Sequence, residues 1–161
     1  MTPPFDDADA LAEDRAPGEG PRRALPARFS PQEALVCAMV LMSAADRSMS
    51  DAELATMSRM VEELPAFGDF SAAEIERVTE AVLPLLDEAD GLDRLTSLIA
   101  EALPMRLRET AYLLACEVAA ADGEASQEEL RFLQDFRIGL DMDRLIAGAI
   151  ERAAKARYQV I

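Results

Sequence analysis

The sequence contains no histidine and no tryptophan, and aromatic residues make up only 5% of it. Without histidine the chain lacks the commonest general base, the Ser/His and Cys/His nucleophile pairs and every imidazole metal ligand. The remaining side chains form no other recognisable catalytic arrangement, so we expect a protein that is not an enzyme. A metal site in this chain would have to consist of carboxylates, carbonyls and water, which suits hard divalent cations.

The chain also lacks a hydrophobic segment long enough to cross a membrane, and it has no excess of positive charge. Its most hydrophobic run, Ala34 to Ala45, has 12 residues, whereas a transmembrane helix needs about 20. The N-terminus carries no export signature, and we therefore expect a cytoplasmic protein. The formal net charge of −15 repels phosphate backbones, so nucleic-acid binding is not expected.

A few polar or reactive side chains lie within the apolar stretches, and we interpret them as structural. Cys37 and Cys116, the two cysteines, are expected to be small buried side chains in a reducing compartment. Glu117 interrupts a stretch that is otherwise broadly apolar. It is either a partly buried acid or, as we prefer, part of one solvated stripe with Arg106 and Glu109.

Half of the residues are apolar, chiefly alanine and leucine with other aliphatic residues, which is typical of a helical protein. Residues 1–28 differ because they contain five prolines and mixed charges, and they cannot bury enough apolar surface to become ordered. We predict a disordered, acidic, proline-rich tail over residues 1–28 and one helical domain over residues 29–161. Phe5 to Leu11 combines acidic with apolar residues, so it is either a docking motif or, as we prefer, part of a solvated tail.

Four Ser-x-x-Glu sequences predict helix N-termini. In this capping box the serine oxygen accepts the third helical N–H, and the glutamate accepts the serine N–H. With the apolar spacing, the boxes predict about seven helices in a single all-α bundle. Pro84 is expected to kink or shorten the third helix. The boxes are Ser30–Glu33, Ser50–Glu53, Ser71–Glu74 and Ser126–Glu129. The helices are expected near residues 31–45, 51–64, 72–86, 91–103, 104–121 and 127–138, and from after Asp141 to about 157.

The sequence contains an internal repeat. Ala44 to Leu54 aligns without gaps on Ala120 to Leu130, at an offset of 76 residues, with six of eleven positions identical. Each copy lies between a very apolar helix and an amphipathic one, so we predict two pseudo-equivalent helical-hairpin halves. Repeated hairpins usually pack against each other, which places the helices near residues 31–45 and 104–121 at the centre of the bundle.

Both copies carry carboxylates that can approach one another when the chain turns back. One interpretation is capping, in which each aspartate accepts loop amides and each glutamate completes its box. The other is a site for a hard divalent cation, shared between two loops too short and too different in spacing to be EF-hands. The chemistry of the residues alone favours capping. The carboxylates are Asp46 and Glu53 in the first copy and Asp122 and Glu129 in the second, with Glu124 as an accessory oxygen donor.

Ala121 to Leu130, with its Ala-Asp-Gly start and its Ser and Glu cap, resembles the signature of TerB-like tellurite-resistance domains. Ala45 to Leu54 resembles a first copy, and the resemblance covers about residues 30–157. The family is related to the N-terminal domain of the co-chaperone DjlA, and its fold is expected to be all-helical with two similar halves. Arg47 stands where glycine is usual, and its charge competes with a metal for Asp46. The resemblance assigns divalent-metal ligation to Asp46, Glu53, Asp122 and Glu129.

The resemblance implies a non-enzymatic interaction module of a stress response that acts through protein partners, often in complexes at the inner face of a membrane. Such a module would use Ca²⁺, Mg²⁺, Mn²⁺ or Zn²⁺ at the acidic loops. The alternative is a co-chaperone-like or membrane-complex adaptor with purely structural loops. A third class, a hydrolase with a carboxylate-bound metal, would need a pocket beside Asp122 and Glu129. Direct binding of the oxyanion tellurite is not expected, because the chain is strongly acidic and has no anion pocket.

Overall fold

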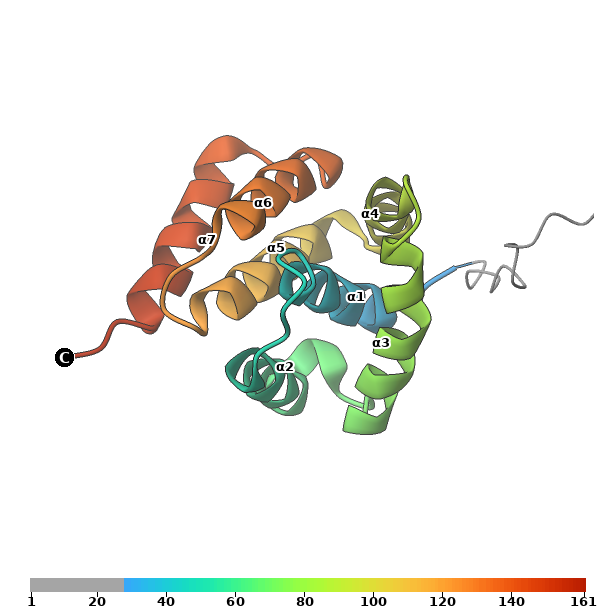
Figure 1. Ribbon diagram of the computed structural model, residues 1–161, viewed down its shortest axis with the longest axis horizontal. Coiled ribbons are helices and arrows are strands. Elements are labelled where there is room, and N and C mark those ends of the chain that lie inside the picture. Colours follow the sequence, from blue (N-terminus) through green and yellow to red (C-terminus); the bar gives the residue numbers. More distant parts are fainter. Residues whose placement is uncertain (1–27) are drawn as a thin grey trace, which may run out of the picture.

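The computed structural model describes residues 28–161, which form seven α-helices and one short 3-10 helix (Figure 1). No strand occurs among these residues, so the predicted all-α bundle is confirmed. The predicted tail, apart from Arg28, lies outside the described residues. The elements in chain order are α1 (Pro31–Ser43), α2 (Asp51–Glu63), η1 (Pro65–Phe67), α3 (Ala72–Leu86), α4 (Gly91–Ala102), α5 (Met105–Ala120), α6 (Gln127–Gly139) and α7 (Arg144–Arg157).

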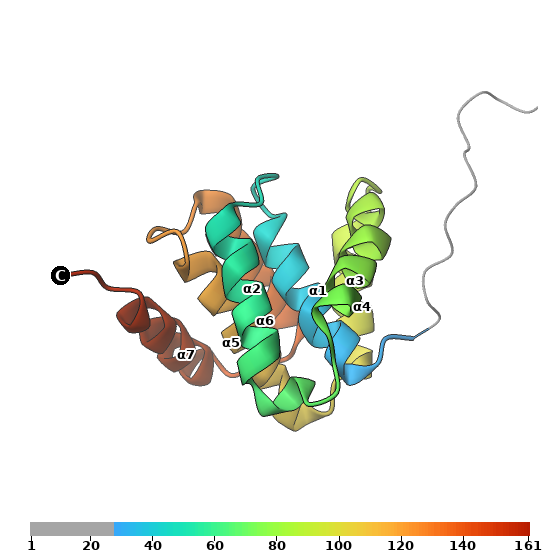
Figure 2. The ribbon, with the colours of Figure 1, turned by 90° about the horizontal axis from the view of Figure 1, so that it is seen from below.

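Helix α1 lies at the centre of the bundle (Figure 2). Every residue from Ala34 to Ser43 is buried, because this helix is apolar nearly all round and must be covered on every side. It packs against α5 most extensively, and also against α3 and α4. Helix α5 in turn carries α7 on its outer side. The prediction that the first and fifth helices are central is therefore confirmed.

Four helices begin where the Ser-x-x-Glu sequences predicted. All four Ser-x-x-Glu sequences form capping boxes. At α1, for example, Glu33 N–H donates to Ser30 Oγ at 3.1 Å, and Ser30 N–H donates to the Glu33 carboxylate at 2.7 Å. Because these bonds join residues only three apart, they form wherever the local sequence permits. Predicted and observed helix ends consequently agree to within about three residues.

Two helix ends need comment. Helix α3 spans the predicted range and ends at Leu86, so Pro84 does not shorten it; a proline so near the C-terminus removes one backbone hydrogen bond from a helix already held by its buried face. The expected kink stays a prediction. Helix α7 begins at Arg144 rather than directly after Asp141, because Asp143 is its cap. The Asp143 carboxylate accepts the N–H groups of Leu145 and Ile146 at 2.8 and 3.2 Å.

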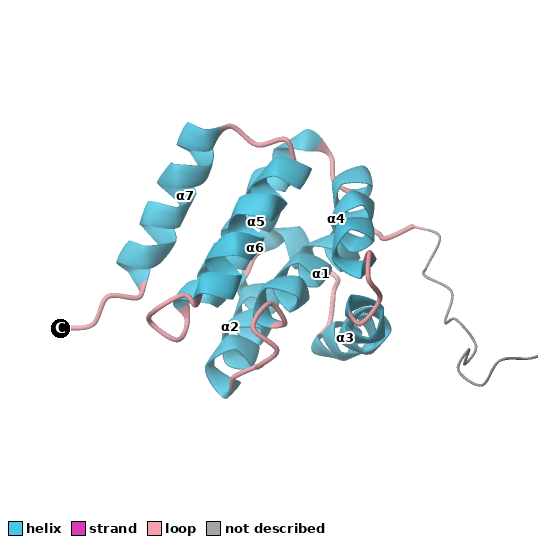
Figure 3. Ribbon diagram, turned by 45° about the horizontal axis from the view of Figure 1, so that its top comes forward, coloured by secondary structure: helices cyan, strands magenta, loops and turns pink. Residues whose placement is uncertain are grey.

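Figure 3 shows the loops that connect these helices, with α7 along one edge of the bundle. Over residues 28–161 no helix combines the length and the apolar character needed to cross a membrane.

Candidate functional site

The two acidic loops follow the two central helices. The first, residues 44–50, joins α1 to α2, and the second, residues 121–126, joins α5 to α6. Since α1 and α5 pack side by side, they bring the loops together. A direct hydrogen bond joins them: Ser50 Oγ–H donates to the Asp122 carboxylate at 3.0 Å, across 72 residues of sequence.

The predicted aspartates lie at the surface of the loops. Asp46 is exposed and accepts both the N–H and the Oγ–H of Ser48 at 2.9 Å, which closes the turn after α1. Asp122 is also exposed, and its bond to Ser50 ties the second loop to the cap of α2. Asp46 thus stabilises its own loop, whereas Asp122 connects the two loops.

The predicted glutamates are buried beneath the aspartates. Glu53 and Glu129 are 3% and 7% exposed, and each completes a capping box. Each uses one carboxylate oxygen for this bond, at 2.7 Å to Ser50 N–H and 2.6 Å to Ser126 N–H. The second oxygen of each glutamate has no bond to another described residue.

The electrostatics of Glu129 show that the carboxylates of both loops act on one another. Burial raises the pKa of Glu129, and the negative charges of Asp46 and Glu53 raise it further, against the lowering effect of its hydrogen bonds with Ser126. Asp46 of the first loop and Glu53 at the start of α2 therefore both act on Glu129 at the start of α6.

The arrangement does not form a closed ligand cage. Within residues 28–161, no three acidic or thiol side chains lie close enough together to ligate one metal ion. The accessory residue Glu124 is exposed and lines a groove between α6 and α7. The donors at the loops are oxygen atoms, a set that fits hard cations better than Zn²⁺, which prefers nitrogen and sulfur.

The two loops share an unusual backbone conformation. Arg47 and Gly123, which occupy equivalent places in the repeat, have positive φ values of 62° and 97°. Glycine adopts this conformation without steric cost, whereas arginine does not. The likeness of cap, turn and conformation agrees with the predicted duplication, which itself stays a prediction.

The preferred interpretation of Glu117 as part of a solvated stripe is wrong. Glu117 is 4% exposed and accepts the Tyr158 hydroxyl at 2.8 Å. Arg59 of α2 donates to the same hydroxyl at 2.8 Å, and Arg157 Nε lies 3.6 Å from the Glu117 carboxylate. A charged residue in an apolar helix was the signal in the sequence, but its partners come from helices far away along the chain.

A second hydrogen bond between a tyrosine and a glutamate also connects α5 with α7. Tyr112 of α5 donates its hydroxyl to Glu151 of α7 at 2.6 Å, while Tyr158, directly after α7, donates to Glu117 of α5. Both tyrosines of the chain thus bond to carboxylates across the contact between α5 and α7. We call these two pairs the tyrosine clasp. Sequence analysis missed it because tyrosine and glutamate have no characteristic spacing between separate helices.

Comparison with known proteins gives one family. A family profile described as tellurite resistance protein TerB matches residues 32–145, which include both acidic loops and helices α1 to α6. No match was found among curated proteins or among solved structures. Because the profile covers more than half of the chain and the fold is the expected all-helical bundle, the protein belongs to the TerB family of tellurite-resistance proteins.

Proposed function

We propose that this protein is a non-enzymatic interaction module of a stress response and that its paired acidic loops bind a hard divalent cation. The observation that carries the proposal is the convergence of carboxylates from both loops. Ser50 and Asp122 join the loops directly, and the charges of Asp46 and Glu53 raise the pKa of Glu129. Mutual repulsion among carboxylates is relieved when a divalent cation binds between them.

The open arrangement of the carboxylates suggests the mode of binding. Mg²⁺ commonly keeps several waters and uses only one or two carboxylates. Asp46 and Asp122 are exposed, and the free oxygens of Glu53 and Glu129 can accept hydrogen bonds from metal-bound water. The site would accordingly be weak and hydrated, and Arg47 beside Asp46 would weaken it further.

The cation would act on the relative position of the two hairpins. Asp122 is held by the cap of α2, so a cation on these loops would stiffen the connection between α1–α2 and α5–α6. The proposed role is to adjust a surface for a protein partner without chemical turnover.

A specific observation also supports the alternative, an adaptor with purely structural loops. The capping boxes of Glu53 and Glu129 and the Asp46 turn account for these carboxylates without a metal. Under this alternative the loops have one fixed arrangement, and partner binding is independent of divalent cations.

Calorimetric titration of chelator-treated, full-length protein with Mg²⁺, Ca²⁺, Mn²⁺ and Zn²⁺ distinguishes the cation-binding module from the adaptor with purely structural loops. We expect saturable binding of the hard cations, weakened about tenfold or more by Asp122→Asn because a primary ligand loses its charge. Asp93→Asn is the matched control, since Asp93 is exposed in the first turn of α4, a helix that joins neither acidic loop.

Either result is informative. Binding that Asp122→Asn weakens and Asp93→Asn does not would establish the site. If the unmodified protein binds no cation and Asp122→Asn lowers the melting temperature, the role of Asp122 is to hold the two loops together through its hydrogen bond with Ser50. That result would support the adaptor.

A further inference from the structure

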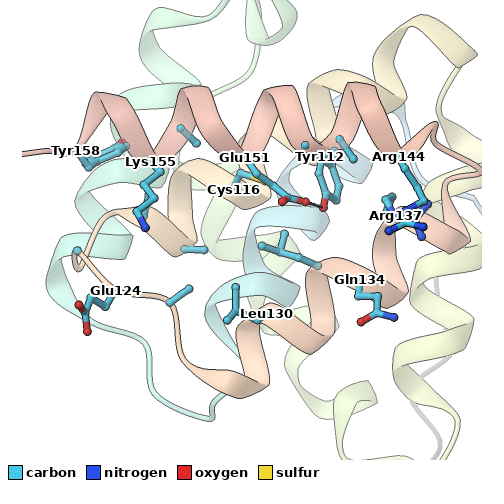
Figure 4. A pocket seen from close by; sticks show the side chains of 18 of the residues that line it. Tyr112, Cys116, Glu124, Leu130, Gln134, Arg137, Arg144, Glu151, Lys155 and Tyr158 are labelled. Carbon is cyan, nitrogen blue, oxygen red and sulfur yellow. Dashed lines mark hydrogen bonds between the residues drawn. The ribbon is translucent and has the colours of Figure 1, made fainter.

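A large groove lies on the opposite side of α5 from its contact with α1. Helix α5 forms its floor, and α6 and α7 form its walls (Figure 4). Both walls pack against α5, but they have at most slight contact with each other. The groove has a volume of about 1090 Å³, which exceeds the usual 300–1,000 Å³ of a small-molecule pocket. Its dimensions suit a peptide segment.

The lining of the groove combines small and apolar residues with charged residues of both signs. The floor includes Cys116, Ala119 and Ala120, but Cys116 and Ala119 are each only 4% exposed, so the open apolar surface lies chiefly on the walls. Leu130 on the α6 wall is 49% exposed, a large apolar side chain open to this space.

The basic residues lie along the groove rather than at one point. Arg137 and Arg144 are at one end, and Lys155 is near the other (Figure 4). None of the three forms a salt bridge with another residue in the part of the chain that the structure describes. The lining also holds two acidic residues, Glu124 and Glu151, so the groove has only a small excess of positive charge. In a chain with a net charge of −15, this excess favours an acidic ligand.

The sequence of this chain contains a segment with the complementary pattern. Between residues 4 and 15, apolar side chains occur at positions 5, 8, 10, 11 and 12, and all of them except Ala10 would lie on one face of a helix. The acidic side chains fall on the other faces; they are Asp6, Asp7, Asp9, Glu13 and Asp14.

We propose that residues 4–15 dock in the groove formed by α5, α6 and α7 of the same chain. Phe5 and Leu11 would contact Leu130 on the α6 wall, and the acidic residues would meet Arg137, Arg144 and Lys155, as in other complexes of an amphipathic helix with a groove. This proposal is independent of cation binding at the acidic loops.

The connecting chain must be nearly fully extended to make this contact. Residues 16–27 can extend about 40 Å, which is similar to the width expected for a domain of this size. A second copy of the chain is a less suitable occupant, because the overall repulsion between two strongly acidic molecules opposes their association.

Hydrogen–deuterium exchange of the full-length protein, measured at low salt by mass spectrometry, tests the proposal. We expect amides of residues 5–15 to exchange about tenfold or more slowly than in an unstructured peptide. Phe5→Ser with Leu11→Ser should abolish this protection without touching the helical domain. Arg144→Glu with Lys155→Glu should do the same by reversing charges in the groove; neither side chain has a described hydrogen bond.

The matched control is Arg106→Glu with Arg152→Glu, which makes the same change in net charge at exposed positions outside the groove lining. It should leave the protection intact. Exchange of residues 5–15 at the unprotected rate in the unmodified chain would overturn the proposal. Protection that survives Arg144→Glu with Lys155→Glu would overturn it too, and so would protection that rises with protein concentration, since the occupant would then be a second copy.

Discussion

At the scale of single residues, Arg47 and Gly123 show that the two acidic loops differ in backbone strain. Both have positive φ values, and a side chain with a Cβ pays roughly 1 kcal/mol for this conformation. Gly123 avoids that cost, so the second loop is the less strained of the two. Arg47 also adds a positive charge beside Asp46, and this charge disfavours a cation in the first loop.

Glu129 gives a prediction about pH. Its pKa is raised by burial and then by Asp46 and Glu53. The native state therefore binds the proton of Glu129 more tightly than the unfolded state does. The stability that this protonation contributes is fully present below the pKa of Glu129 in the unfolded state. It is lost as the pH rises through the pKa of Glu129 in the native state. Glu129→Gln can keep the capping bond but cannot ionise. We expect this variant to gain stability relative to the unmodified protein between pH 4 and pH 7, measured by urea unfolding.

Glu33 is the matched control, because it also completes a capping box but its pKa is shifted in the opposite direction. Burial acts to raise its pKa, but bonds from the Ser30 backbone and from Arg77 outweigh that effect and lower it. Its stabilising contribution is therefore present above the unfolded pKa and is lost as pH falls. Glu33→Gln should lose stability relative to the unmodified protein over the same pH range. The same trend in both variants would contradict this account of Glu129.

At the scale of elements, the tyrosine clasp adds two hydrogen bonds to the packing of α7 against α5. Tyr158→Phe would leave Glu117, which is 4% exposed, with only Arg157 at 3.6 Å. A buried carboxylate that loses its hydrogen bond costs about 1–3 kcal/mol. We expect a loss of that size in urea unfolding, together with faster amide exchange along α7.

Tyr112→Phe is the matched variant on the other side of the clasp. Its partner Glu151 is exposed and can be solvated again when the bond is lost, so the expected cost is about 0.5–1 kcal/mol. Equal losses in the two variants would show that burial of Glu117 does not determine the strength of the clasp.

The same elements show how far sequence could predict this structure. The starts of α1, α2, α3 and α6 were predictable because a capping box acts between residues three apart. The central position of α1 followed from its all-round apolar surface. The burial of Glu117 and the bond between Ser50 and Asp122 could not be predicted in this way. Each depends on how separate helices pack, which no local pattern of spacing encodes.

At the scale of the whole molecule, the net charge of −15 opposes the compact state through self-repulsion. The exposed ion pairs that salt would weaken, such as Arg94 with Glu88, contribute little. We therefore expect the melting temperature to rise by a few degrees when NaCl increases from about 20 to 500 mM. Glu76→Gln with Glu80→Gln, at exposed positions on α3, should reduce that rise because it removes two negative charges.

The rise in melting temperature caused by NaCl is the reference against which a specific effect of Mg²⁺ is measured. MgCl₂ at the same ionic strength as NaCl screens the chain to a similar extent, and only binding to the native state adds stability beyond it. An additional rise in melting temperature that Asp122→Asn removes, and that Glu76→Gln with Glu80→Gln keeps, would locate the extra stability at the acidic loops. If MgCl₂ and NaCl give the same rise in all three proteins, the effect of divalent cations on this molecule is screening of its net charge alone.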